Sequence, residues 1–291
     1  TLFRSDGQRL ALAGKQHYQP AGKSRIWLYT AGQDKPVLWT NTAIYCDDWP
    51  RWSPDGRRIA LVRKELGEGR RTCIWWKDVA TGAGRRLTKG PDDRQPSWSP
   101  DGQALVFRRG LGPTESVLAV FEVSSGRVSL LQIPPGLLGE PFWGRDGFIY
   151  YTRYRLVTRE TKVNGQTYHV QVIGGGSLWR HHPATGEGGA VLAAELDQRM
   201  PALSPDGKHL AFYGQRSGLG QALSIPDPTC WALFLREQTT GKLTEVATDV
   251  ALTGGPPIWS RDGISIIFYS LRKKVPALWS CPAAPSVEAG S

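Results

Sequence analysis

A pattern of seven residues recurs along the chain and limits its fold more than any other feature. The pattern reads Pro-x-Trp-Ser-Pro-Asp-Gly at residues 50–56 and 96–102, and residues 257–263 repeat it with Arg in place of the second Pro. Residues 141–147 and 201–207 are looser copies, and a shortened copy lies near the start of the chain. The six copies end in glycines at positions 7, 56, 102, 147, 207 and 263, which are 45 to 60 residues apart. Such a period predicts an array of similar structural units.

Each repeat has the composition of four short antiparallel strands. The Asp-Gly pair is followed by an apolar run, such as residues 59–62, and this arrangement predicts a β-hairpin because Gly accepts the positive φ of a tight turn. A third strand follows, as at residues 72–76, and a Thr-Gly turn at 81–82 leads to a fourth strand at 85–88. Four strands in each of six repeats predict an all-β fold, a six-bladed β-propeller of four-stranded antiparallel blades.

The propeller is predicted to take up the whole chain, 1–291, as a single domain. The blades are expected near residues 1–48, 49–94, 95–139, 140–199, 200–255 and 256–291. The repeated Trp or Phe before each turn is expected to fill the wedge between neighbouring blades, since large rings suit that position.

The repeat resembles the TolB-type propeller repeat, in which Pro-x-Trp-Ser-Pro-Asp-Gly precedes an Ile-Ala-Phe-like strand. Related blades occur in the propellers of prolyl-oligopeptidase-like and tricorn-like proteases. The resemblance covers nearly the whole chain; it implies a propeller fold and leaves the function open.

Charged residues gather in the segments expected to be loops leading into the innermost strands. In a propeller these loops share one face around the central channel, where ligands commonly bind. The predicted channel-mouth residues are Asp47, Asp48, Asp93, Arg94, Glu140, Asp197 and Arg199. They could bind a cation, an ammonium group, or an Arg or Lys side chain. Mutual salt bridges and turn capping are the alternative, and the sequence favours it because structural ion pairs imitate functional ones.

The fourth repeat carries an insertion, residues 152–173, that is predicted to form a long β-hairpin. Asn164-Gly165 is a strong two-residue turn signal, and it pairs Val163 with Gln166. In that register one face of the hairpin is largely apolar and is a candidate partner-binding surface, formed by Val157, Arg159, Val163, Tyr168, Val170 and Val172. That face is expected either to fold back on the propeller or to grip another subunit, and the sequence leaves both open.

Composition narrows the choice of partners. The net charge of +10 favours an anionic partner or surface, but no nucleic-acid-binding motif is present and nucleic acid is disfavoured. No window approaches the ~20 apolar residues of a membrane-spanning helix. The five histidines and four cysteines lack metal-ligand spacing, so neither a metal nor another cofactor is expected.

Two functions are compatible with these features. The first is a non-catalytic protein-binding or scaffolding propeller, a subunit of a larger periplasmic or extracellular assembly. The alternative is an enzyme or small-ligand binder at the channel mouth, such as a hydrolase or lyase acting on a sugar or peptide. The sequence favours the first, because it contains no G-x-S-x-G nucleophile motif and no catalytic residue can be named.

Overall fold

The computed structural model describes residues 2–3, 9–15, 24–41, 44–66, 71–164, 166–192, 196–215, 231–252, 255–270 and 277–283. Within these ranges the chain forms β-strands and no α-helix, which confirms the all-β prediction. In the same ranges, no helix has the length and hydropathy needed to cross a membrane.

The strands of the described residues form six antiparallel sheets, and each sheet contains consecutive strands of the chain. The first sheet contains β1 (Leu2–Phe3), β2 (Arg9–Lys15), β3 (Ser24–Thr30) and β4 (Val37–Leu38). The second contains β5 (Tyr45–Trp52), β6 (Arg58–Glu65), β7 (Thr72–Asp78) and β8 (Gly84–Arg86). The third contains β9 (Asp93–Trp98), β10 (Ala104–Gly110), β11 (Ser116–Glu122) and β12 (Val128–Leu130).

The remaining sheets follow the same order. The fourth contains β13 (Leu137–Trp143), β14 (Ile149–Val163), β15 (Gln166–His181) and β16 (Gly188–Ala190). The fifth contains β17 (Asp197–Leu203), β18 (His209–Gln215), β19 (Trp231–Glu237) and β20 (Leu243–Ala247). In the sixth, three strands lie within the described residues: β21 (Ile258–Trp259), β22 (Ser265–Ser270) and β23 (Ala277–Pro282).

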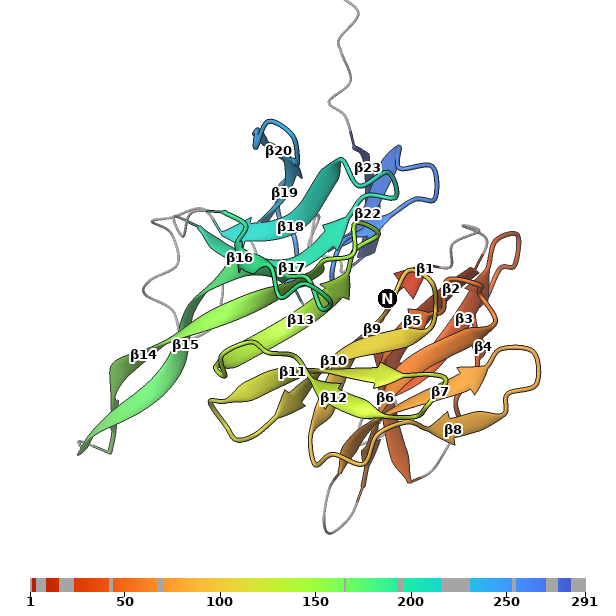
Figure 1. Ribbon diagram of the computed structural model, residues 1–291, viewed down its shortest axis with the longest axis horizontal. Helices are drawn as coiled ribbons and strands as arrows, with labels where there is room; N and C mark the ends of the chain where they lie inside the picture. The colour runs from red at the N-terminus through yellow and green to blue at the C-terminus, as the bar shows by residue number, and fades with distance from the viewer. Residues whose placement is uncertain are drawn as a thin grey trace, which may run out of the picture.

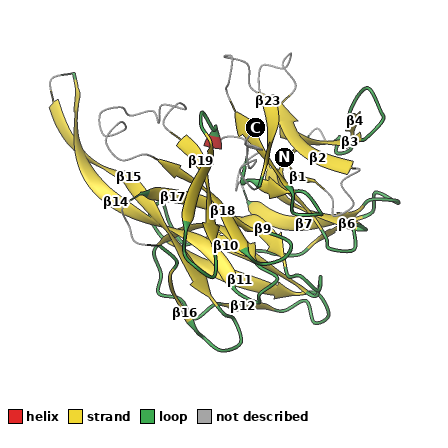
Figure 2. Cartoon of the chain, turned by 90° about the horizontal axis from the view of Figure 1, so that it is seen from above, coloured by secondary structure: helices red, strands yellow, loops and turns green. Residues whose placement is uncertain are grey.

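The first strands of the sheets gather toward the middle of the molecule, and the last strands lie at its periphery (Figure 1). The view from above shows β14 and β15 reaching well beyond the other strands (Figure 2). Four-stranded antiparallel sheets, predicted from the repeat, are therefore present, and their first strands surround a common central region.

The repeated Ser-Pro-Asp-Gly segment forms the same turn in successive sheets. In the third sheet the Ser99 hydroxyl lies 2.6 Å from Asp101 Oδ1, which also accepts a hydrogen bond from the Gln103 amide at 2.9 Å. Gly102 has φ of 72°, a conformation that side chains disfavour. Equivalent Ser–Asp contacts occur at Ser53, Ser204 and Ser260. The turn chemistry thus explains why Ser, Asp and Gly recur together.

The repeated tryptophans pack between sheets, as predicted. Trp98 is buried in a core cluster with Val62 and Ile74 of the second sheet and Leu105 of its own sheet. Its indole Nε1 donates a 3.0 Å hydrogen bond to the carbonyl of Arg51 in the sheet before. Trp259 bonds in the same way to the Ala202 carbonyl at 2.9 Å. Each indole therefore contributes both apolar burial and one hydrogen bond to the contact between sheets.

The first strand of each of the second, third, fourth and fifth sheets contains a β-bulge at the residue before the proline of the repeat. Trp49, Gln95, Glu140 and Met200 have φ between 47° and 56°, and the strand register shifts at these positions. The strands begin before the bulge, so the predicted loops leading into them are wrong: β5, β9, β13 and β17 start at 45, 93, 137 and 197. We call the residues before the bulge the leading segments (45–48, 93–94, 137–139 and 197–199). The residues after it are the trailing segments (51–54, 97–100, 142–145 and 202–205).

Candidate functional site

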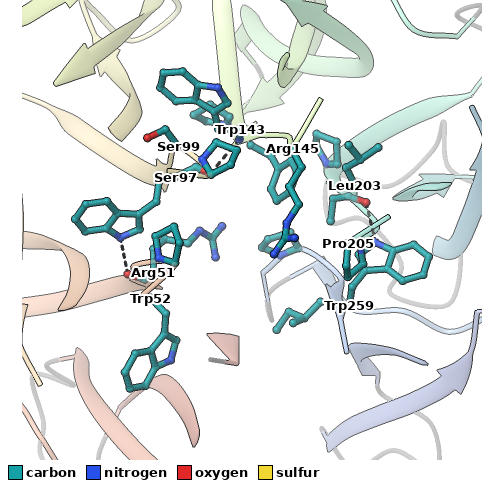
Figure 3. Close-up of a pocket in the computed structure, with 18 of the residues that line it drawn as sticks. Arg51, Trp52, Ser97, Ser99, Trp143, Arg145, Leu203, Pro205 and Trp259 are labelled. Atoms are coloured by element: carbon teal, nitrogen blue, oxygen red, sulfur yellow. Dashed lines mark hydrogen bonds between the residues drawn. The ribbon is translucent and has the colours of Figure 1, made fainter. Parts of the chain in front are cut away.

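A pocket of about 280 Å³ lies between the trailing segments, near the middle of the molecule (Figure 3). All four trailing segments line it, and residues 256–259 of the sixth sheet complete the wall. Residues of the Pro-x-Trp-Ser-Pro part of the repeat, from the second to the sixth sheet, therefore supply its lining.

The walls of this axial pocket are mainly apolar. Tryptophan, proline and aliphatic side chains predominate, and the indole Nε1 groups of Trp98 and Trp259 are already engaged with backbone carbonyls. The serines are engaged as well: Ser97 Oγ accepts a hydrogen bond from the Trp143 amide at 3.1 Å, and Ser53 and Ser99 hold the turns. The wall thus offers few polar groups of its own to a ligand.

Two arginines supply the charge of the axial pocket. Arg51 occupies the x position, where other repeats have Ser97, Phe142 or Ala202. Arg145 stands where three other repeats have the pocket-lining prolines Pro54, Pro100 and Pro205. Figure 3 shows both guanidinium groups pointing toward the same central space. Each arginine is thus a departure from the repeat at a position that faces the pocket.

The guanidinium of Arg51 is held in place without a carboxylate. Its Nε donates to the Pro96 carbonyl at 3.1 Å, and its Cζ lies 5.6 Å from the centroid of the Trp49 ring. Burial lowers the pKa of Arg51 to about 10. In the part of the chain that the structure describes, neither Arg51 nor the exposed Arg145 forms an ion pair.

Glu140 is the acidic residue at the edge of the axial pocket. It is 8% exposed, and one of its carboxyl oxygens accepts a hydrogen bond from the Tyr154 hydroxyl. Burial raises the pKa of Glu140, although the nearby Arg199 opposes this shift. The neutral acid is therefore favoured over the carboxylate more than it would be in water.

Asp197 and Arg199 form an ion pair next to Glu140. Arg199 Nη2 lies 2.7 Å from Asp197 Oδ2, and its Nε lies 3.0 Å from Oδ1. The guanidinium also packs over the rings of Tyr154 and Trp231, at 5.2 and 4.9 Å. Asp197 accepts a further hydrogen bond from the Gly176 amide at 2.7 Å, so this pair joins the fourth and fifth sheets.

The other predicted channel-mouth residues are engaged within the second and third sheets. Asp47 is fully buried and binds Arg63 through two hydrogen bonds of 2.7 and 2.8 Å. Asp93 binds Arg109 in the same manner at 2.7 and 3.0 Å, and Arg94 pairs with Asp92. Asp48 is exposed and accepts a hydrogen bond from the Trp49 amide. Internal salt bridges and capping, the alternative considered from the sequence, describe these contacts.

These seven residues therefore do not form one open acidic cluster. Glu140, Asp197 and Arg199 lie together, while Asp47 and Asp93 each pair with an arginine on the neighbouring strand. Across the described ranges, no group of three or more His, Cys, Asp or Glu residues has the arrangement of a metal site.

The inserted hairpin forms a long two-stranded ribbon from β14 and β15. Val163 pairs with Gln166, Thr161 with Tyr168, Arg159 with Val170 and Val157 with Val172, the register expected from the turn. Tyr168 and Val170 are 46% and 37% exposed, while Val157, Arg159 and Val172 are partly exposed. The side chain of Val163 lies outside the described residues. The ribbon projects from the molecule rather than packing along it (Figures 1 and 2).

Comparisons of the sequence with known proteins identify relatives over parts of the chain. No protein-family model matches. The chain is 27% identical over 213 residues to "Uncharacterized peptidase YuxL" of Bacillus subtilis, which covers 72% of this chain and 28% of that protein. It is 37% identical over 59 residues to "Tol-Pal system protein TolB 1" of Novosphingobium aromaticivorans, 20% of this chain and 13% of that one. The chain thus spans less than a third of the length of either relative.

Solved structures share the architecture over nearly the whole chain. TolB from Acinetobacter baumannii superposes with a TM-score of 0.74 at 17% identity, covering 97% of this chain and 65% of that one. A putative TolB from Agrobacterium tumefaciens gives 0.68 at 16% identity, with 98% and 89% covered. Oligogalacturonate lyase from Vibrio parahaemolyticus gives 0.56 at 14% identity, with 98% and 89% covered. The chain therefore has the fold of the TolB β-propellers, as its repeat predicts, and that fold also occurs in an enzyme.

Proposed function

We propose that this chain is a non-catalytic propeller of six blades that binds a protein partner within a larger extracytoplasmic assembly. The single observation that carries this proposal is the ribbon of β14 and β15, which projects from its sheet with apolar side chains open to solvent. The likeness to TolB propellers supports the ring of blades and the extracytoplasmic location. The net charge of +10 favours an acidic partner.

The two faces of the ribbon differ in a way that suits a partner. Tyr168 and Val170 lie on the face that also carries Val157 and Val172, whereas Glu160 and His169 pair on the opposite face. A two-stranded ribbon alone is marginal in water, and covering an apolar face stabilises it by about 25 cal/mol per Å². A partner that covers Val157, Arg159, Val163, Tyr168, Val170 and Val172 would supply that stabilisation.

Matched variants of the two faces test the proposal. The apolar-face variant is Tyr168→Ser with Val170→Ser, and the control is His169→Ser with Gln171→Ser on the same strand. Each tagged protein is recovered from extracts of its native host, and cross-links to copurifying proteins are mapped by mass spectrometry. We expect one partner to cross-link to the ribbon of the wild type and the control and to be lost from the apolar-face variant. Equal recovery with all three proteins, or cross-links that avoid the ribbon, would reject the proposal.

A second candidate function is that of an enzyme or small-ligand binder at the channel mouth. The similarity to a protein named as a peptidase and the shared fold of a lyase favour it. Its binding residues would be Asp47, Asp48, Asp93, Arg94, Glu140, Asp197 and Arg199. Purified protein would then cleave a peptide or an oligosaccharide, and Asp48→Ala, which removes an exposed carboxylate, would abolish cleavage without unfolding the chain. If the purified protein cleaves no member of a panel of peptides and a panel of oligosaccharides, this candidate function is rejected.

A further inference from the structure

We propose that the axial pocket binds a ligand through a carboxylate group held between Arg51 and Arg145. This site lies in the trailing segments, apart from the ribbon, and Glu140 is the one channel-mouth residue among the described residues that line it. The proposal does not depend on either function proposed above. Figure 3 shows the two guanidinium groups directed into one space. A carboxylate is the planar anion that matches the paired N–H donors of a guanidinium.

The positive charge of the axial pocket is not neutralised by its own lining. Glu140 is the one acidic residue among the described residues that line the pocket, and its carboxyl group is engaged by Tyr154. Burial raises the pKa of this carboxyl group, so its neutral form is favoured more than it would be in water. The pKa of Arg51 is lowered by burial with no carboxylate to offset it. An arriving anion would therefore gain a charge-assisted hydrogen bond and relieve an unpaired, partly buried cation.

The remaining walls of the pocket determine the chemical character of the rest of the ligand. Several of their polar groups are already used: Trp98 and Trp259 donate to backbone carbonyls, and Ser97 accepts from a backbone amide. A sugar with many hydroxyls would find few free partners, whereas an apolar body would lie against proline, indole and aliphatic carbon. The volume of about 280 Å³ is at the lower limit of ordinary ligand pockets, so this body is small.

Two kinds of ligand combine a carboxylate with a small apolar body. One is a free organic acid with a short carbon chain. The other is the C-terminal carboxylate of a peptide whose last residues enter the pocket. Both would place a carboxylate between the arginines and apolar carbon against the walls, and matched probes separate them.

Calorimetric titration at low ionic strength tests the proposal on the whole chain. The probes are succinate, with succinamide as its uncharged control, and N-acetyl-Ala-Pro, with its C-terminal amide as control. We expect at least one acid to bind with one-to-one stoichiometry and its amide to bind at least tenfold more weakly. Succinate binding alone identifies a free acid, and binding of the acetylated dipeptide alone identifies a peptide terminus. Failure of both acids to bind at millimolar concentration would overturn the proposal.

Variants locate the binding within the protein. Arg51→Gln and Arg145→Gln should each weaken the acid at least tenfold, whereas Arg57→Gln, the same charge change on an exposed residue outside the pocket, should change affinity less than twofold. Arg145 is exposed, so its variant is expected to fold even if Arg51→Gln does not. Equal weakening by all three variants would show a general charge effect and would overturn the site, as would no weakening by Arg145→Gln.

Discussion

The leading and trailing segments of the same strands differ in whether the arginines beside them are paired with a carboxylate. In the leading segments, Asp47 and Asp93 bind Arg63 and Arg109 of the neighbouring strands through two hydrogen bonds each. A few residues further on, Arg51 faces the axial pocket with no carboxylate partner among the described residues. Charge is thus used for structure on one side of the bulge and is left available for a ligand on the other.

The bulge explains how one strand can hold a buried ion pair and also line the pocket. A residue with positive φ before proline shifts the register by adding a residue to one strand, so the side chains after it face differently from those before it. In β5, Asp47 lies before the bulge and is fully buried, whereas Arg51 follows it and lines the pocket. The repeated proline therefore separates a structural segment from a binding segment.

The largest expected effect comes from breaking a leading-segment ion pair. Asp47→Ala leaves Arg63, which is 8% exposed, buried without its partner, and this should lower the free energy of unfolding by about 3–5 kcal/mol. Urea denaturation measures the loss. The double variant Asp47→Ala with Arg63→Met should recover much of it, because Met can pack between the Tyr45 and Trp75 rings that Arg63 now contacts. A loss below 1 kcal/mol would mean that these pairs are not structural.

A smaller effect is expected at the turns that end the trailing segments. Asp101→Asn weakens the hydrogen bonds from Ser99 and Gln103 and should cost about 1 kcal/mol at pH 7. The Ser99 hydrogen bond lowers the pKa of Asp101 below its unfolded value of about 3.9. The advantage of wild type over variant should therefore persist above about pH 4 and vanish as the pH falls through the folded-state pKa. Denaturation curves across this range would contradict the account if the two proteins differed equally at every pH.

Most of the fold could be predicted from sequence because the repeat encodes local turn chemistry. The turn residues fixed the hairpins, and Asn164-Gly165 gave the register of β14 and β15. The sequence does not identify the leading segments as strands, because a non-glycine residue with positive φ, such as Trp49, has no clear sequence signature. The partners Arg63 and Arg109 lie 16 residues from their aspartates, so the sequence does not show these ion pairs between strands.

The axial pocket was also missed, although the sequence holds a signal for it. Arg51 stands where other copies have small or apolar residues, and Arg145 stands where three other copies have proline and the copy at 257–263 has Arg261. One copy does not reveal which positions face the centre; that depends on how the sheets pack around it. Comparing the repeats position by position for charged exceptions selects both Arg145 and Arg261, and only the packing of the sheets shows that Arg145 lines the pocket.

A pH effect is expected at Glu140, on the bulge between the two segments. Because burial raises the pKa of Glu140 above its unfolded value, its contribution to stability is present below about pH 4.3 and is lost as the pH rises through the folded-state pKa. Glu140→Gln keeps the acceptor for Tyr154 and carries no charge. The variant should therefore gain stability relative to wild type as the pH rises from about 4.3 toward the folded-state pKa of Glu140. Parallel pH profiles of the two unfolding free energies would refute this.

The smallest effect on stability is expected in the trailing segments themselves. Arg145 is exposed and unpaired among the described residues, so Arg145→Gln should change the free energy of unfolding by no more than ~0.5 kcal/mol. Thermal denaturation of this variant beside Asp47→Ala compares the two segments directly. A loss of several kcal/mol from Arg145→Gln would show that the trailing arginines are structural too.

A crystal structure of the protein grown with succinate tests the division between the segments most directly. The account predicts a carboxylate within ~2.7–3.2 Å of guanidinium nitrogens of both Arg51 and Arg145, with the Asp47–Arg63 and Asp93–Arg109 pairs intact. Succinate bound instead at Arg63 or Arg109, with their aspartates displaced, would contradict it.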